Sequence, residues 1–155
     1  MSQVNLCHCG SGLQIEKCCL QYISDGHKAP TAEALMRSRY TAYVLGDEAY
    51  LRASWHETTC PESLNLKQSD IQWTGLSICK ILGGREGDRR GVVEFIAKYI
   101  VSGKLAQIHE SSRFINQYGR WLYMDGDLIS ENTVSRNSAC SCGSGKKFKR
   151  CCGKA

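Results

Sequence analysis

Residues 90–116 read RGVVEFIAKYIVSGKLAQIHESSRFIN, and this stretch decides the fold class of the central part of the chain. Apolar side chains occupy every second position in its first half, at Val93, Phe95, Ala97 and Tyr99. A period of two is typical of a strand with one buried face. The residues SGK then provide a turn of hairpin length before a second strand-like run begins. The stretch therefore predicts two long antiparallel strands joined by a tight turn.

Two further strand-like runs flank this hairpin. The four runs cover residues 71–82, 90–101, 105–116 and 120–126. They are separated by GGREGD, SGK and QYG, which all have the composition and length of hairpin turns. The sequence thus predicts a four-stranded antiparallel meander.

Before the strands, the apolar period changes to that of helices. Thr31 follows a proline and is a candidate N-cap, and Gly46 marks the end of the same helix. The apolar stripe of this helix consists of Met36, Tyr40, Tyr43 and Val44. Asp47 can cap a second helix, one side of which carries Tyr50, Leu51, Ser54 and Trp55, and Pro61 is expected to start a short third turn. Helices followed by a meander predict an α+β domain over residues 30–128, with the helices packed on one face of a curved sheet.

The two ends of the chain carry the same cysteine pattern. Residues 7–19 read CHCGSGLQIEKCC, and residues 140–152 read CSCGSGKKFKRCC. Both contain C-x-C-G-S-G, eight residues between the inner cysteines, and a final C-C pair. A repeat of this length at opposite ends of one chain indicates a duplicated functional unit.

Four thiolates in this spacing suit Zn²⁺, which takes four protein ligands in structural sites, with Zn–S bonds of about 2.3 Å. The glycines after each C-x-C permit positive φ and a close approach of backbone to sulfur. The sequence therefore predicts two zinc ions in two small knuckles, at residues 1–25 and 136–155. The predicted ligands are Cys7, Cys9, Cys18, Cys19, Cys140, Cys142, Cys151 and Cys152. Because such sites have no open coordination position, we expect no catalysis at the metal.

The adjacent cysteines leave a second interpretation open. The pairs Cys18–Cys19 and Cys151–Cys152 can oxidise, as in a disulfide or redox protein, although regularly spaced cysteines in a reducing compartment bind metal more often.

Two adjacent cysteines on a helix reach one ion only where the helix ends. Gly153 supplies that ending in the second copy, whereas the first copy has Leu20 there and needs another backbone solution.

One histidine and two cysteines in or between the motifs are left out of the predicted ligand sets. His8 is not expected to be a ligand, because Ser141 holds its place in the second copy. Cys60 and Cys79 belong to neither motif, and we expect them in the core as small apolar residues.

The repeated element resembles the SEC-C motif, the zinc-binding element best known from the C-terminus of the SecA translocation ATPase. The order of helices and strands looks like the cone-shaped fold of nuclear transport factor 2 (NTF2). The whole chain more closely resembles the uncharacterised bacterial YchJ-like family, in which SEC-C motifs flank such a domain. The likeness rests on both cysteine elements, LMRSRYTAY at 35–43, ESSRF at 110–114 and FKRCCG at 148–153. It implies a cone-like fold and zinc, but no established reaction.

The C-terminal copy differs from the N-terminal copy in charge. It carries Lys146, Lys147, Lys149 and Arg150, which predict a docking surface for acidic protein or for ribosomal RNA. In the alternative interpretation these side chains are solvated and only neutralise the thiolates. The net charge of +5 counts every thiol as neutral and falls to about +1 once two zinc sites form, so it does not itself indicate nucleic acid. The likeness to the motif of SecA implies a partner in the secretion or ribosome machinery.

Glu110 is the candidate for catalysis. Alternation along the third strand places it on the inward face with Ser112, and a carboxylate in an apolar pocket suits general acid–base work. The other candidates to line such a pocket are Arg37, Arg39, Tyr40, Trp55, Trp73 and Tyr99. In the alternative interpretation, Glu110 pairs with Arg37 or Arg39 as a bridge between helix and sheet, and the aromatic residues are ordinary core.

The pattern as a whole favours a zinc-binding adaptor protein over an enzyme. No run of about 18 apolar residues is present to span a membrane, and the first fifteen residues lack the apolar stretch of a secretory signal. We therefore expect a cytoplasmic protein. A small enzyme or small-molecule binder that uses Glu110 is the second hypothesis, and neither excludes a dimer.

Overall fold

The predicted strands form an antiparallel meander. The computed structural model describes residues 3–66 and 70–129, and within these ranges the sheet has four strands in the order β1-β2-β3-β4. The strands are β1 (Gln72–Gly83), β2 (Arg90–Val101), β3 (Lys104–Gln117) and β4 (Arg120–Leu128). The helical elements precede them and are the 3₁₀ turn η1 (Ile15–Lys17), α1 (Leu20–Ile23), α2 (Ala32–Leu45) and α3 (Glu48–Ala53). The α+β class expected from the sequence is confirmed.

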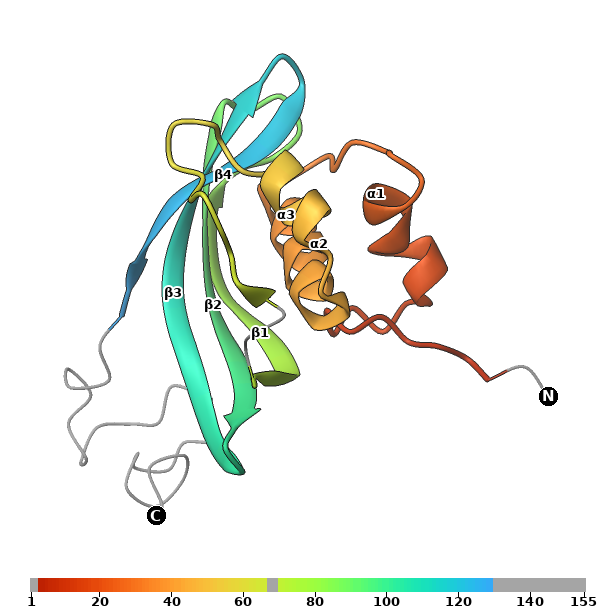
Figure 1. The fold of residues 1–155 in the computed structure, drawn as a ribbon. Helices are drawn as coiled ribbons and strands as arrows, with labels where there is room; N and C mark the ends of the chain where they lie inside the picture. The colour runs from red at the N-terminus through yellow and green to blue at the C-terminus, as the bar shows by residue number, and fades with distance from the viewer. Residues whose placement is uncertain (1–2, 67–69, 130–155) are drawn as a thin grey trace, which may run out of the picture.

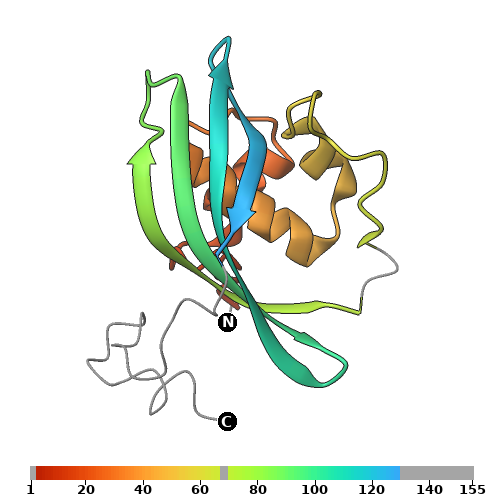
Figure 2. The same cartoon turned by 90° about the vertical axis from the view of Figure 1, so that its left-hand side faces the viewer.

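The helices cover one face of a curved sheet (Figures 1 and 2). Register shifts in β1 after Trp73 and after Ile78, and in β4 at Met124, mark β-bulges, which increase bending and twist. On β2, the side chains that alternate toward the helices are buried: Val93, Phe95 and Ala97. The concave face of the sheet therefore provides one wall of the core.

Helix α2 is the central element of the helical layer. The Thr31 side chain accepts a hydrogen bond from the backbone N–H of Ala34 at 3.0 Å, and Gly46 ends the helix with φ of 72°. Its buried surface is wider than the predicted stripe and includes Ala32, Leu35, Met36, Ser38, Arg39, Tyr40, Thr41 and Ala42. The physical reason is that α2 lies between the sheet and the N-terminal segment, so both sides of the helix are covered (Figure 1).

Helix α3 begins where the sequence predicted, but the third turn does not. The Asp47 side chain accepts from the backbone N–H of Tyr50 at 3.0 Å and so caps α3. No helix starts at Pro61 in the described part of the chain. The turn forms earlier, where the backbone N–H of Cys60 donates to the His56 carbonyl at 3.0 Å, because this bond closes the chain before the proline is reached.

The N-terminal cysteines belong to the same apolar core as the helix and sheet. Buried Cys7, Cys9, Cys18 and Cys19 lie in one cluster with α2 and β2 side chains such as Leu35, Tyr40 and Val93. None of the helices in the described ranges is long and apolar enough to cross a membrane.

Candidate metal centre

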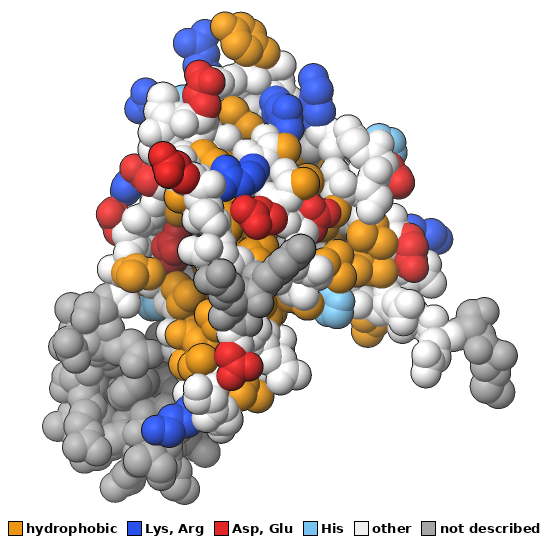
Figure 3. All heavy atoms as spheres, in the orientation of Figure 1, with side chains coloured by type: hydrophobic (Ala, Val, Ile, Leu, Met, Phe, Trp, Pro, Cys, Tyr) orange, Lys and Arg blue, Asp and Glu red, His pale blue; other side chains and the backbone are white. Residues whose placement is uncertain are grey.

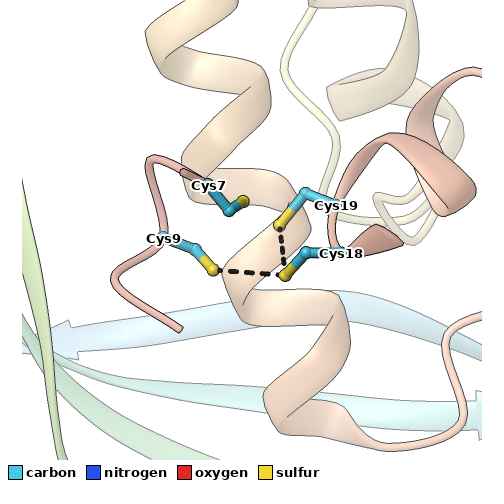
Figure 4. Close-up of side chains that lie close together, drawn as sticks. All are labelled: Cys7, Cys9, Cys18 and Cys19. Atoms are coloured by element: carbon cyan, nitrogen blue, oxygen red, sulfur yellow. Dashed lines mark hydrogen bonds between the residues drawn. The ribbon is translucent and has the colours of Figure 1, made fainter. Parts of the chain in front are cut away.

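The four N-terminal cysteines converge on one point. Their Sγ atoms all lie within 4.8 Å of one another, and all four side chains are buried. Cys7 and Cys9 approach from one side, and Cys18 and Cys19 from the other (Figure 4). The Sγ atom of Cys18 is 3.6 Å from that of Cys9 and 3.9 Å from that of Cys19. Thiolates at the corners of a zinc tetrahedron are about 3.8 Å apart, so the donor set fits Zn²⁺.

The distance between the sulfurs of Cys18 and Cys19 also bears on the disulfide interpretation. A disulfide bond holds its sulfurs about 2.05 Å apart. Cys18 and Cys19 are free thiols in the structure, with sulfurs 3.9 Å apart. This is the separation of two ligands of one ion.

Two backbone features bring the cysteines together. Gly10 and Gly12 have φ of 79° and 80°, so the loop after Cys9 turns back, and the backbone N–H of Cys7 donates to the Leu13 carbonyl at 2.8 Å. The turn η1 then ends at Cys18, which has φ of −121° and ψ of −103°. Helix α1 starts only after Cys19. This break between two helical pieces aims both adjacent cysteines at the same point without a glycine at position 20.

Helix α2 fixes the cysteine cluster to the rest of the molecule. Cys7 Sγ lies 3.6 Å from Thr41 Oγ1, and Arg37 Nη1 donates to the Cys9 carbonyl at 2.7 Å. Within the loop, Ser11 Oγ lies 3.2 Å from Cys18 Sγ. His8 is exposed and is not part of the cluster.

The close approach of the thiols shifts their pKa values in opposite directions. Hydrogen bonds from Cys19 and Cys9 lower the pKa of Cys7. The pKa of Cys19 is raised, first by its hydrogen bond to Cys7 and then by its bond to Cys9 and by burial. Burial also raises the pKa of Cys18. Cysteine binds a metal ion as the thiolate, so a divalent cation at the centre of the cluster would release protons from the thiols.

The C-terminal predictions lie outside the described residues. This applies to the ligands Cys140, Cys142, Cys151 and Cys152, and to the basic residues Lys146, Lys147, Lys149 and Arg150.

On the inner face of the sheet, Glu110 has tyrosine and serine neighbours. Its Oε1 accepts from Ser112 Oγ at 2.8 Å and from Tyr123 Oη at 3.0 Å. Burial, followed by the charge of Glu110, raises the pKa of Tyr123. Sequence reasoning missed Tyr123, although the period of two along β4, with buried Trp121 two residues earlier, was a signal for it.

The helix-to-sheet ion pair is not formed. Arg39 Nη1 donates to the Leu51 carbonyl at 2.8 Å and to Ser54 Oγ at 2.7 Å, and its guanidinium lies 4.8 Å and 4.6 Å from the ring centres of Trp55 and Tyr123. Arg37 leaves the inner face altogether, because it bonds Glu33 and the Cys9 carbonyl.

The remaining pocket candidates form a second aromatic group. Trp73 lies 6.0 Å from Tyr40 and 5.3 Å from Tyr99, measured between ring centres. A hollow of 340 Å³ beside it is lined by Tyr43, Val44, Leu45, Gly46, Leu64, Leu66, Ile71 and Trp73. Glu110 and Ser112 do not line this hollow. The structure therefore separates the predicted pocket residues into three groups. These are Arg37 at the cysteine loop, then Arg39 and Trp55 with Glu110 and Ser112 around Tyr123, and then Tyr40, Trp73 and Tyr99.

The prediction for Cys79 is wrong, and Cys60 is only half-buried. Cys79 is exposed because it follows Ile78, which pairs with the core residue Phe95, so alternation along β1 points Cys79 to the outer face of the sheet.

Comparisons with known proteins agree with this architecture. The family model for the YchJ middle NTF2-like domain matches residues 31–126, and the SEC-C motif model matches residues 136–154. A UPF0225 protein of Enterobacter sp. (strain 638) is 43% identical over 154 residues, covering 96% of this chain and 97% of the relative. A UPF0225 protein of Chromobacterium violaceum is 48% identical over 123 residues, covering 77% of this chain and 90% of the relative.

Two solved structures share the fold. The solution structure of a SEC-C motif-containing protein from Rhodopseudomonas palustris has a TM-score of 0.72 at 30% identity, covering 81% of this chain and 99% of that one. The crystal structure of a SEC-C motif-containing protein from Psychrobacter arcticus has a TM-score of 0.60 at 28% identity, covering 97% and 96%.

Proposed function

This chain belongs to the UPF0225 family, with a YchJ-type NTF2-like middle domain and a SEC-C motif, and from this premise we propose that it is a zinc-binding adaptor protein. The observation that carries the proposal is the convergence of four buried thiols within 4.8 Å of one another. Cys7, Cys9, Cys18 and Cys19 hold one structural zinc ion in this proposal. The four cysteines of the C-terminal motif hold a second ion.

The N-terminal zinc ion has a structural role in this proposal. Four cysteine ligands fill the tetrahedron, so the ion offers no position to a substrate. The site joins two short loops and is bonded to α2 through Thr41 and Arg37. Zinc therefore clamps the N-terminal segment against the helical layer.

The C-terminal motif supplies the docking surface. Its four basic residues follow one another closely in the sequence, whereas acidic and basic side chains of the described part are interspersed on the face shown in Figure 3. A concentrated positive charge favours an acidic partner, either a protein of the secretion machinery or the ribosome. Reduced thiols are required for such a motif, which is consistent with a cytoplasmic location.

Elemental analysis of protein purified without chelator or metal-affinity resin tests the zinc assignment. We expect two zinc ions that remain bound through purification, and one in Cys9→Ser. A chain with no zinc and few free thiols would overturn the assignment and restore the disulfide interpretation.

Partner recovery tests the docking assignment. The variant Lys146, Lys147, Lys149, Arg150→Ala should lose partners that the wild type retains. The matched control removes the same charge from exposed positions elsewhere, with Arg85, Arg89, Lys98 and Lys104 changed to alanine. If both variants recover the wild-type partners, the basic residues have no docking role.

A small ligand at the inner face is a second candidate function. Glu110 is bonded to hydroxyl groups rather than to an arginine, and the nearby Trp55 Nε1 is buried without a hydrogen-bond partner among the described residues. Trp55 packs against the ring of Tyr123, which bonds Glu110, and an unsatisfied buried donor in such a group suits a small polar molecule. Mass spectrometry of molecules released from denatured wild type and from Glu110→Gln tests this. A compound found only with the wild type supports the second candidate, and identical spectra contradict it.

A further inference from the structure

The outer face of the sheet, opposite the helices, carries a second group of metal-binding side chains. Cys79 on β1, Glu94 on β2 and His109 on β3 place one ligand atom each within 4.8 Å of the others. His109 Nε2 lies 2.8 Å from Glu94 Oε1. We propose that these three residues form a solvent-facing site for a zinc-like divalent cation, separate from the cysteine knuckles.

The sheet register explains why the three side chains meet. Ile78 pairs with Phe95, but the next pair is Lys80 with Glu94, so Cys79 is an extra residue in β1. At such a bulge, two residues of one strand oppose a single residue of its partner, which here brings Cys79 opposite Glu94. Because Ile78 pairs with Phe95, which faces the core, the next residue, Cys79, points to the outer face beside Glu94.

His109 reaches the group from the other side of β2. It pairs with Ile96, which is two residues beyond Glu94 and so on the same face of the sheet. Diagonal neighbours of this kind are within reach of long side chains. The hydrogen bond between His109 and Glu94 holds both donors in place before a cation arrives.

The donor set is typical of zinc. Thiolate, imidazole and carboxylate are the three protein donors that Zn²⁺ binds, with bonds of about 2.0–2.3 Å. Two such donors on one tetrahedral ion are separated by about 3.3–3.5 Å. The observed separations of 2.8 Å between His109 and Glu94 and at most 4.8 Å to Cys79 require only small side-chain rotations to match.

Exposure distinguishes this site from the N-terminal knuckle. The side chains of His109 and Glu94 are 19% and 27% exposed, and Cys79 is exposed, whereas all four knuckle cysteines are buried. Three protein ligands leave a fourth position, which here faces solvent. A site of this type exchanges its ion more readily than a closed four-cysteine site, and it can accept water or a side chain of another molecule as the fourth ligand.

The competing explanation is a surface ion pair with an unrelated thiol beside it. Histidine and glutamate pair on protein surfaces without metal. The two explanations differ in the role of Cys79. A bound cation needs the Cys79 thiol and the His109 imidazole together, whereas the ion pair of His109 with Glu94 forms without the thiol.

Zinc stoichiometry of the full chain separates these explanations. Wild type, Cys79→Ser, His109→Gln and the control Cys60→Ser are brought to equilibrium with zinc buffers over a range of free-ion concentrations. We expect Cys79→Ser and His109→Gln each to saturate at one zinc ion per chain fewer than the wild type, and Cys60→Ser to match it. Equal stoichiometry in all four proteins, or a loss in only one of the two site variants, would overturn the three-ligand site.

Cobalt provides a second measurement on the same proteins. Co²⁺ bound to a thiolate gives a charge-transfer absorption in the near ultraviolet. Titration should show one component that is absent in Cys79→Ser and persists in Cys9→Ser, which lacks a knuckle ligand. A spectrum unchanged by Cys79→Ser would contradict the site while leaving the knuckle assignment intact. Unchanged thermal melting of the two site variants would show that the loss is not due to unfolding.

Discussion

At the scale of single residues, Arg39 is the most unusual group in the helical layer. Its side chain is 3% exposed, and burial lowers its pKa. Its guanidinium lies over the rings of Trp55 and Tyr123 and donates to the Leu51 carbonyl. Its charge is therefore balanced by aromatic faces and a backbone dipole, which is a role that the planar guanidinium fills better than an ammonium group.

We predict that Arg39→Lys lowers the free energy of unfolding by about 2 kcal/mol, because lysine keeps the charge but loses the stacked geometry. Arg52→Lys is the matched control, since Arg52 is half-exposed and pairs with Glu48 on the same helix. Its effect should stay within about 0.5 kcal/mol. Denaturant unfolding measures both, and equal effects would show that the stacking contributes nothing.

One buried and three partly buried tyrosines predict a loss of stability at high pH. Burial raises the pKa of Tyr40, Tyr43, Tyr50 and Tyr123. The contribution of these tyrosines to the free energy of unfolding is fully present below their unfolded pKa of about 10. It is lost as the pH rises above that value, because the unfolded chain ionises there while the tyrosines of the folded chain still hold their protons. The free energy of unfolding should therefore fall above pH 10 or so, which denaturant titrations at successive pH values measure. A constant value up to about pH 12 would contradict this.

At the scale of elements, period and turn composition were sufficient for the sheet. The predicted runs agree with the observed strands to within two residues at each boundary, because each strand has one buried face and each turn carries glycine. The caps of α2 and α3 were also correct, since Thr31, Gly46 and Asp47 act through local backbone bonds. The exposure of Cys79 was missed although the period of two was a signal for it, since Leu76 and Ile78 pair with the core residues Ala97 and Phe95 and Cys79 follows on the other face.

The close approach of two glycines at the base of the β1–β2 hairpin gives a prediction at this scale. A Cβ atom at Gly91 would lie 2.5 Å from the Gly84 Cα and 3.0 Å from the Ala32 Cβ, so the hairpin and the start of α2 would have to separate. We expect Gly91→Ala to lower the free energy of unfolding by about 2–3 kcal/mol. Gly75→Ala in β1 is the control, because no atom lies within 4 Å of its Cβ position. Chemical denaturation of both variants measures the difference, and a harmless Gly91→Ala would mean that the base of the hairpin adjusts freely.

At the scale of the whole molecule, the sequence predicts two equivalent knuckles, but it contains no signal for how either one packs. The sequence grouped Cys7, Cys9, Cys18 and Cys19 by their spacing, and the structure brings these four thiols within 4.8 Å of one another. The sequence did not show that these cysteines join the core of the central domain, since Thr41 and Arg37 contact the loop across about thirty residues of chain. We therefore expect the N-terminal cysteine cluster to unfold together with the central domain.

Loss of N-terminal zinc should therefore destabilise the entire described fold. Cys9 is fully buried against the core, and a ligand present at a thousand times its dissociation constant contributes about 4 kcal/mol to stability. We expect Cys9→Ser to lower the melting temperature of the main transition by roughly 10 °C or more. A strong zinc chelator should reproduce this shift in the wild type, which separates loss of metal from a packing defect.

The equivalent change at the other end of the chain is the control. We expect Cys142→Ser to remove one zinc ion while the main thermal transition keeps its midpoint, because the C-terminal site is predicted to be independent of the central domain. Calorimetry together with zinc analysis measures both quantities on the same samples. Equal shifts in Cys9→Ser and Cys142→Ser would mean that both ends are coupled to one core. No shift in either would mean that the fold is stable without metal, and zinc would then act in recognition rather than in folding.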